Sequence, residues 1–176
     1  MASSSALLRK HNIPFWKQLV ASGLFTGLSP VASGTVASAV AVGFYFVPGL
    51  ANPWAMLAMA GVAFGVGLWL AGPCEEALGD DPSFVTIDEF AGQWITLASP
   101  LVIGQPHWQW AVICFFTFRA FDIAKIWPAS YFDRRRGPLG IMADDVVAGI
   151  YANLASHIIW YGLSFAGLVT KFLGEQ

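Results

Sequence analysis

Residues 118–149 read FRAFDIAKIWPASYFDRRRGPLGIMADDVVAG and alternate cations with carboxylates. Together with residues 80–90, DDPSFVTIDEF, this stretch carries most of the charged side chains of the chain. A charge beside apolar surroundings is costly unless it is paired, hydrated or bound to a metal ion. The sequence therefore predicts that the chemistry is concentrated in these two segments.

The rest of the chain has the composition of an integral membrane protein. Charged residues make up 11% of it, against about 25% in soluble domains. Residues 18–74 contain no Asp, Glu, Lys or Arg, and this run is far longer than the about 20 residues that cross a bilayer. We expect an all-α fold: a polytopic helical membrane protein, built as a compact bundle with about five spans or partly inserted helices.

Glycine, proline and serine breaks delimit the expected helices. The length predicts one domain over residues 1–176, in which residues 1–17 lack a secretory signal and form a cytoplasmic N-terminal segment. The spacing of Gly61 and Gly65 permits close helix packing. The predicted helices cover residues 35–47, 54–72, 90–103, 108–125 and 146–170.

The distribution of Lys and Arg predicts the orientation. Arg9, Lys10 and Lys17 lie near one end of the chain, and residues 134–136 are three consecutive arginines. Loops rich in Lys and Arg face the cytoplasm. With about five spans, residues 75–89 fall on the same side, so the two charged segments can meet.

Several function classes are disfavoured by what the chain lacks. A net charge of −2 argues against nucleic acid as a partner, because nucleic-acid binding needs a basic surface. Cys74 and Cys114 are isolated and fit packing positions better than a disulfide. Cys114 precedes Arg119 among phenylalanines and does not form the loop of a thiolate phosphatase. What remains is a metal and carboxylate site without an obvious covalent nucleophile.

Arg119, Asp122 and Lys125 recur at steps of three and share one face of a helix. Two interpretations fit this spacing. One is a ladder of ion pairs. The other is a phosphate clamp in which Arg119 binds with two N–H groups, Lys125 acts as a point charge, and Asp122 orients one of them or joins the metal. Residues 134–136 fit topology determinants or contacts with anionic lipid headgroups.

Two pairs of acids are candidates for a cation site. Thr86 and Glu89 match a capping box, which leaves Asp88 unexplained. Asp144 and Asp145 precede the last apolar run, where a carboxylate suits the positive end of a helix. Adjacent acids repel each other, and a divalent cation between the two pairs would remove the repulsion. Mg²⁺ is the natural ion for such oxygen ligands.

Four ordered segments of the chain resemble the phosphatidylglycerophosphatase A family. They are GLSP at 27–30 with Gly34 and Thr35, then IDEFAGQWI at 87–95, FRAFDIAKIWP at 118–128 and GIMADDVVAG at 140–149.

The resemblance implies an Mg²⁺-dependent enzyme that hydrolyses phosphatidylglycerophosphate to phosphatidylglycerol and phosphate. It also implies a multi-pass protein of the bacterial inner membrane, with the active site on the cytoplasmic side. The lipid substrate and the bilayer would be its partners, and no nucleic acid would bind. The positions that match the family's polar motifs are Asp88, Glu89, Arg119, Asp122, Lys125, Asp133, Asp144 and Asp145.

Roles for these side chains follow from their chemistry. We expect Arg119 and Lys125 to bind phosphate, and Asp122 or Glu89 to accept a proton from the attacking water. The expected Mg²⁺ ligands are a subset of Asp88, Glu89, Asp144 and Asp145. The expected catalytic residues are Asp88, Glu89, Asp122 and Asp145.

Two other functions fit an apolar chain with clustered charges. One is a small membrane transporter or channel whose charged residues line an ion pathway. The other is a lipid-binding scaffold without turnover. Both lack hydrolysis, so phosphate release from a phospholipid monoester separates them from the enzyme.

Overall fold

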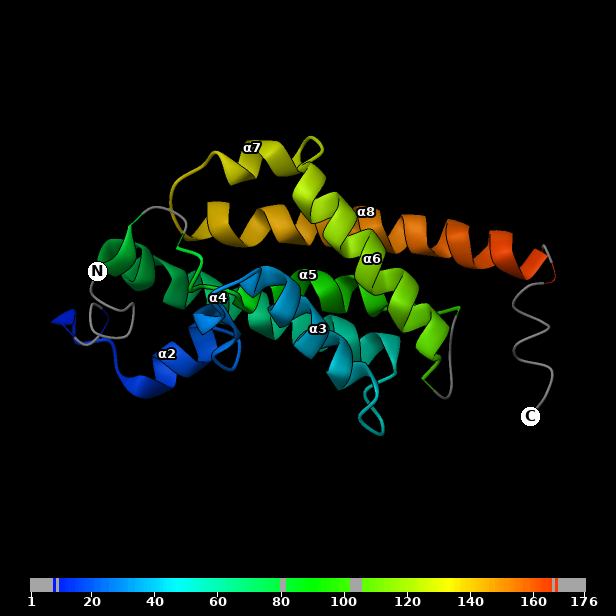
Figure 1. Cartoon of the computed structure of the whole chain (residues 1–176), viewed down its shortest axis with the longest axis horizontal. Coiled ribbons are helices and arrows are strands. Elements are labelled where there is room, and N and C mark those ends of the chain that lie inside the picture. The colour runs from blue at the N-terminus through cyan, green and yellow to red at the C-terminus, as the bar shows by residue number, and fades with distance from the viewer. Residues whose placement is uncertain (1–7, 9, 80–81, 102–105, 166, 168–176) are drawn as a thin grey trace.

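The computed structural model describes residues 8, 10–79, 82–101, 106–165 and 167, and within these residues all regular structure is helical (Figure 1). The all-α prediction is therefore confirmed for the described chain. The elements are α2 (Phe15–Ala21), the 3₁₀ turn η1 (Thr26–Leu28), α3 (Ser33–Tyr45), α4 (Pro53–Leu78), α5 (Ile87–Leu97), α6 (Trp108–Ala124), α7 (Ala129–Asp133) and α8 (Pro138–Phe165).

The predicted helices 35–47, 54–72 and 108–125 correspond closely to α3, α4 and α6. The last predicted helix begins too late, because α8 already starts at Pro138, a residue well suited to the first turn of a helix. The predicted helix 90–103 is wrong at both ends, because α5 covers Ile87–Leu97 and the described residues 98–101, which include Pro100, are not helical. The predicted helix 146–170 also ends too late, since α8 stops at Phe165 and Gly167 has φ +70°. Residues 102–103 and 168–170 lie outside the described part of the chain. The short elements α2, η1 and α7 were not predicted, because each is too brief to show a helical period.

Two of the described helices, α4 and α8, are long and apolar enough to cross a membrane by length and composition. The other apolar helices are shorter: α3 has 13 residues, α5 has 11 and α6 has 17. A full span needs about 20 residues. The arrangement of five spans therefore stays a prediction.

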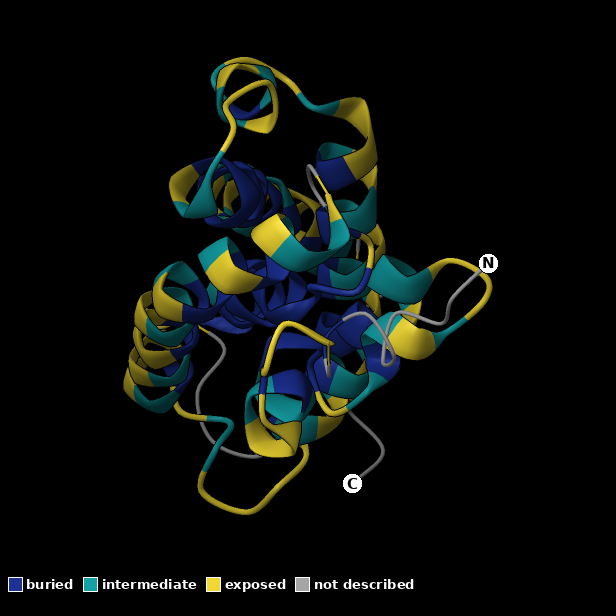
Figure 2. Cartoon of the chain, turned by 90° about the vertical axis from the view of Figure 1, so that its left-hand side faces the viewer, coloured by how far each residue is buried: buried dark blue, intermediate teal, exposed yellow. Residues whose placement is uncertain are grey.

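Helix α5 forms the centre of the bundle. All of its residues except Ile95 are buried, and it packs against α3, α4, α6 and α8. Figure 2 shows the buried residues gathered in the middle, with exposed residues on the outward sides of the surrounding helices. Asn153 of α8 donates hydrogen bonds to the carbonyl groups of Ile95, Thr96 and Ala98, so the end of this buried helix has partners for its free carbonyls.

The backbones of α5 and α8 approach closely where Gly92 faces Gly149. A Cβ atom added to Gly149 would lie 2.5 Å from the Gly92 carbonyl oxygen, and one added to Gly92 would lie 2.6 Å from the Asp145 carbonyl oxygen. Thr96 strengthens the crossing by donating from its hydroxyl to the Gly149 carbonyl oxygen at 3.2 Å. This contact brings the first turn of α5 next to the part of α8 that carries Asp145.

The crossing makes a prediction about stability. Gly149→Ala forces the two backbones apart, so we expect the free energy of unfolding to fall by about 1–3 kcal/mol, as in other overpacked sites. Gly65→Ala on α4 is the matched control, because nothing lies within 4 Å of its added Cβ atom. Thermal unfolding followed by circular dichroism in detergent measures both. An unfolding midpoint for Gly149→Ala equal to that of Gly65→Ala would contradict this packing.

The same open space around Gly61 and Gly65 shows that the close helix packing expected from their spacing is absent from the described chain. The polar end of α4 is instead joined to the start of α8. A carboxylate oxygen of Glu75 accepts a hydrogen bond from the Gly137 amide at 3.1 Å. The two long helices thus place their charged ends together.

Candidate active site

The two charged segments meet in one cavity. Its volume is about 360 Å³, and its walls come from the start of α3, the start of α5, the end of α6, α7 and α8. The predicted convergence of distant acids at one place is what the structure shows. The polar residues that line the cavity are Ser33, Ser83, Thr86, Asp88, Glu89, Asp122, Lys125, Asp133, Asp144 and Asp145.

Three buried carboxylates form the centre of the site. Glu89 on α5, Asp122 on α6 and Asp145 on α8 each offer an oxygen atom, and these atoms lie within 4.8 Å of one another. The predicted ligand set contained Glu89 and Asp145 but not Asp122. Asp88 and Asp144 line the same cavity outside this group of three.

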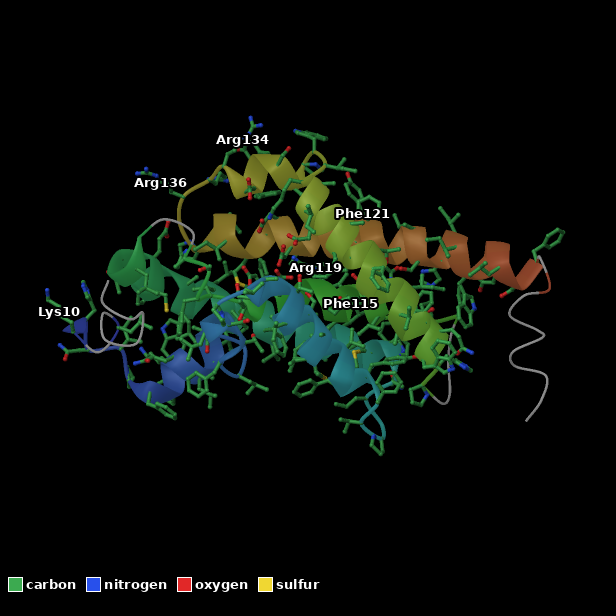
Figure 3. The ribbon with its side chains drawn as sticks, in the orientation of Figure 1. Lys10, Phe115, Arg119, Phe121, Arg134 and Arg136 are labelled. Atoms are coloured by element: carbon green, nitrogen blue, oxygen red, sulfur yellow. The ribbon has the colours of Figure 1, made fainter. Side chains whose placement is uncertain are left out.

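Arg119 binds two of these acids at once. Its guanidinium makes ion pairs with Glu89 and, at 3.0 Å, with Asp122. Ser38, fully buried on α3, donates a hydrogen bond to Glu89 at 2.9 Å and accepts one from Arg119 at 3.3 Å. Figure 3 shows Arg119 inside the bundle, whereas Arg134 and Arg136 point away from it. Arg119 thus holds the acids in place from the side of α6.

Lys125 makes the second basic contact. It ends α6 in the left-handed conformation, with φ +46°, which is unfavourable for a residue with a side chain. Its ammonium group pairs with Asp122 and Asp133 at 3.3 Å each, and also with Asp144. Burial lowers the pKa of Lys125, but the negative charges around it outweigh that effect and hold the pKa above its ordinary value. Lys125 is therefore a permanent cation at the edge of the cavity.

The arrangement on α6 contains the ion-pair ladder, and of the two cations of the expected phosphate clamp Lys125 lines the cavity whereas Arg119 does not. Arg119, Asp122 and Lys125 do pair along the helix. Both cations also contact acids from other elements, so the ladder belongs to a network that surrounds the cavity. A phosphate that enters the cavity would meet Lys125 directly.

The burial of Glu89 bears on the charge of the site. Burial raises the pKa of Glu89, the nearby charge of Asp122 raises it further, and the Arg119 guanidinium opposes the rise. A carboxylate in such surroundings gains stability as an anion when another cation is bound beside it.

Two expectations about helix starts are wrong. Thr86 makes no side-chain cap for α5, because its hydroxyl is hydrogen-bonded to Thr26 at 3.0 Å. The Glu89 side chain does not cap either, since it contacts Arg119 and Ser38. Asp144 and Asp145 lie in the second turn of α8 and not at its start, so neither caps that helix. Packing of the acids toward one another overrides the local pattern.

Ser38 was not predicted as a site residue, and the contact that Gly34 makes in the site was not predicted either. A Cβ atom added to Gly34 would lie 1.9 Å from a carboxylate oxygen of Glu89 and 3.2 Å from the Arg119 guanidinium. Only glycine therefore lets the start of α3 lie against this ion pair. The sequence feature that could have indicated Gly34 is the GT pair at 34–35, which belongs to the segments that resemble the family.

This contact gives a prediction about activity. Gly34→Ala displaces the Glu89 carboxylate, so we expect phosphate release to fall at least about tenfold, the scale of losing one positioned group. Gly43→Ala lies on the same helix with nothing within 4 Å of the added Cβ atom, and it should retain activity. Initial rates on a phospholipid monoester measure both variants. Equal rates would remove Gly34 from the site.

The arginine run lies beside the site but not within it. Arg134, Arg135 and Arg136 are exposed and line a separate cavity of about 190 Å³, which also includes Glu75 and Asp133. Neither cavity has Arg119 in its lining. The exposure of the arginine run fits the predicted role in topology or headgroup contact.

The donor set fits a hard divalent cation. The cluster supplies carboxylate oxygens alone, and its acids outnumber the cations that face them. Oxygen Oδ1 of Asp144 is buried and has no hydrogen-bond partner. Carboxylates with spare lone pairs are the ligands that Mg²⁺ and Ca²⁺ accept.

Comparison with known proteins identifies the family. The family model for phosphatidylglycerophosphatase A matches residues 19–160. A putative phosphatidylinositol-3-phosphatase of Bacteroides thetaiotaomicron is 37% identical, over 78% of this chain and 89% of its own length. Phosphatidylglycerophosphatase A of Escherichia coli is 37% identical over 75% of this chain and 76% of its own length.

A further relative supports the same assignment. Phosphatidylglycerophosphatase A of Haemophilus influenzae is 35% identical, over 81% of this chain and 88% of its own length. No solved structure matches the chain. Because the family match covers most of the chain and includes every residue of the carboxylate cluster, the protein belongs to the phosphatidylglycerophosphatase A family and is a phosphatase.

Proposed function

We propose that this protein hydrolyses phosphatidylglycerophosphate to phosphatidylglycerol and phosphate in an Mg²⁺-dependent reaction of phospholipid biosynthesis. The observation that carries the proposal is the cluster of three buried carboxylates, Glu89, Asp122 and Asp145, with Arg119 and Lys125 beside it. A phosphate monoester needs cations for its oxygens and a base for the attacking water. The site contains groups for both tasks.

Glu89, Asp122 and Asp145 are the residues that would hold the ion. Bound there, Mg²⁺ would supply a Lewis acid for the phosphate oxygens. Asp144 then serves to orient Lys125, with which it is paired. This assignment revises the predicted ligand set in three positions, since Asp122 joins it, Asp144 leaves it for the lysine, and Asp88 leaves it as well.

The remaining side chains have roles that follow from their positions. Lys125 neutralises phosphate oxygens within the cavity, while Arg119 keeps two of the carboxylates in place. Asp88 lines the cavity next to Glu89, whose backbone amide donates to it at 2.9 Å. Asp88 is the side chain that accepts the proton of the attacking water. The sequence pointed to Asp122 or Glu89 for this role, but both of these acids belong to the ion site.

The length of α8 supports a site at the membrane surface. Residues 146–165 rise about 30 Å along the helix axis, which matches the hydrocarbon core of a bilayer. Asp144 and Asp145 would then lie at the boundary of that core, where a phosphorylated headgroup is found. Residues 53–72 of α4 give the same length, followed by Glu75 and Glu76. Both candidate spans thus have their charged ends beside the site.

These features support a protein of the bacterial inner membrane with the site on the cytoplasmic side. Lys10 and the arginine run lie toward the end of the molecule where α8 begins, as the labelled Lys10, Arg134 and Arg136 show (Figures 1 and 3). Basic segments are retained on the cytoplasmic side. The shorter helices α3, α5 and α6 would be partly inserted, and of these α5 packs against both long helices.

Removal of the metal ion makes a direct prediction. In detergent micelles of phosphatidylglycerophosphate, the purified protein should release phosphate with Mg²⁺ and lose almost all of that activity in excess EDTA, because the phosphate oxygens then have Lys125 but no Lewis acid. Added Mg²⁺ should restore the rate. Activity that persists in EDTA would contradict the metal assignment while leaving the phosphatase intact.

The same preparation separates the competing functions. Phosphatidylinositol 3-phosphate is the second substrate to test, because the Bacteroides relative carries the name of a phosphatase for that lipid. Faster release from it would replace the proposed headgroup. In liposomes, solute flux without hydrolysis would support a transporter or channel, and binding without hydrolysis would support a scaffold.

A further inference from the structure

A second cavity lies on the other side of α5 from the carboxylates. Its volume is about 430 Å³, and none of the described residues that line it is polar or charged. Ile87, Phe90 and Trp94 recur at steps of three and four and face this cavity. Asp88 and Glu89 lie on the opposite face of the same helix. The lining residues are Val20, Gly23, Leu24, Phe44, Ala58, Met59, Val62, Ala63, Val66, Ile87, Phe90 and Trp94.

The floor of this apolar groove is fixed and contains no free polar group of its own. Phe44, Phe90 and Trp94 pack against one another edge to face, with ring centroids 5.4–6.2 Å apart. The Trp94 indole N–H donates to the Ala41 carbonyl oxygen at 3.0 Å. The groove therefore offers nothing to hydrogen-bond a water molecule, and an apolar occupant is favoured there.

The groove is open to the outside. Val62 on α4 is 66% exposed and Leu24, which follows α2, is 51% exposed, whereas Ile87 and Phe90 at the floor are buried. A cavity of this volume lies within the range of ligand sites. Its shape and lining suit a flexible hydrocarbon chain that enters from the side.

We propose that this groove binds an acyl chain of the lipid substrate. The proposal rests on the proposed function and adds the site that recognises the lipid tail. The link from the terminal phosphorus to the first acyl carbon of phosphatidylglycerophosphate has about ten single bonds and extends to about 12 Å. Helix α5 is about 10 Å across. The lipid has to pass around α5, over about 16 Å for half the circumference of the helix, so its first acyl carbons span the remaining distance when the phosphate is at the carboxylates and the tail is in the groove.

Charge at the end of the groove supports the same occupant. Lys17 lies on α2, one turn before Val20, and its ammonium group is 4.5 Å from the centre of a Trp69 ring and 5.5 Å from that of Trp16. Tryptophan and lysine together are typical of the boundary between membrane and water. A cation at that boundary complements the anionic headgroup of a lipid whose tail lies in the groove.

The test compares two substrates that share a headgroup. One is diacyl phosphatidylglycerophosphate in detergent micelles, and the other is glycerophosphoglycerophosphate, which has no acyl chains. The variant Val62→Trp fills the mouth of the groove from an exposed position, so the fold should tolerate it. Val112→Trp on α6 is the control, because Val112 is 45% exposed and lines neither the groove nor the carboxylate cavity.

We expect Val62→Trp to lower kcat/KM for the diacyl substrate at least about tenfold, chiefly through KM, because the tail loses apolar contacts. Its kcat/KM for glycerophosphoglycerophosphate should equal that of the wild type. Val112→Trp should match the wild type on both substrates. The groove proposal is overturned if Val62→Trp behaves like Val112→Trp, or if it loses the same factor on both substrates.

A labelling experiment tests the groove proposal without relying on turnover. A diacyl phosphatidylglycerophosphate with a diazirine at the end of one acyl chain should, on illumination, label peptides from residues 58–66 and 87–94. Equal labelling of the exposed faces of α6 and α8 would overturn it. A wild type that releases phosphate from neither substrate overturns the proposed function, and the labelling then still reports on the groove.

Discussion

Asp145→Asn is expected to abolish phosphate release while leaving the protein at least as stable as the wild type in buffer without Mg²⁺. Asp145 is buried beside Glu89 and Asp122, and their oxygens lie within 4.8 Å of one another. Asparagine keeps the size of the side chain, removes one negative charge from a repelling group and supplies a weaker ligand. We expect kcat/KM to fall about 100- to 1,000-fold or more, the scale of losing a group that stabilises transition-state charge.

The rate should fall whereas the stability without Mg²⁺ should not, and this combination distinguishes a metal ligand from a residue that only supports the fold. The unfolding midpoint of the wild type should rise when Mg²⁺ is added, because an ion that binds the folded state stabilises it. That rise should be absent in Asp145→Asn. The control is Glu76→Gln, an exposed acid outside the cavity. A variant that keeps the wild-type rate, or that loses activity only because it unfolds, would exclude Asp145 as a ligand.

Arg119→Ala is expected to have the largest effect on stability. Arg119 is paired with Glu89 and Asp122, and its side chain is 15% exposed. Its removal leaves the buried Glu89 without its cation and Asp122 with Lys125 alone, and breaking a buried pair typically costs about 3–5 kcal/mol. The loss should be smaller in Mg²⁺ than in EDTA, because a bound ion would compensate part of the same charge. Activity should also fall below detection, since the acids lose their alignment.

Thermal unfolding in detergent, with and without Mg²⁺, measures this prediction. Arg119→Lys keeps the charge but cannot bind two carboxylates with one planar group, so it should be intermediate in both stability and rate. Arg134→Ala removes an exposed arginine and should change the free energy of unfolding by no more than about 0.5 kcal/mol. If Arg119→Ala is as stable as Arg134→Ala, the ion pairs seen here do not hold the acids.

The sequence predicted the helical class and the approximate positions of α3, α4 and α6, because long uncharged runs between Gly and Pro breaks are a strong signal. It did not predict that α8 begins at Pro138. Residues 134–137, which precede the apolar run that begins at residue 146, are three arginines and a glycine. This composition suggested a loop between helices. The start of α8 is stabilised by contacts with α7 and α4, among them the bond from Gly137 to Glu75, and such contacts leave no local pattern.

For the site, the sequence indicated which acids meet in one cavity but not how they group. Asp88 and Asp144 are adjacent in sequence to Glu89 and Asp145, and adjacency suggested paired ligands. The close crossing of α5 and α8 at Gly92 and Gly149 turns one acid of each pair toward α6. Asp122 joins that group because its helix is held there by Arg119. The capping interpretation of Thr86 failed for a similar reason, since a tertiary hydrogen bond to Thr26 replaced the local one.

Crystals of the full chain soaked with Mn²⁺ in place of Mg²⁺ provide the most direct measurement. The anomalous scattering of Mn²⁺ marks its position without reference to activity, and the ligand distances follow from the refined structure. Our account predicts a peak bound by carboxylate oxygens of Glu89, Asp122 and Asp145. A peak held by other residues, such as Asp133 and Glu75 beside the arginine run, or the absence of any peak at saturating Mn²⁺, would contradict it.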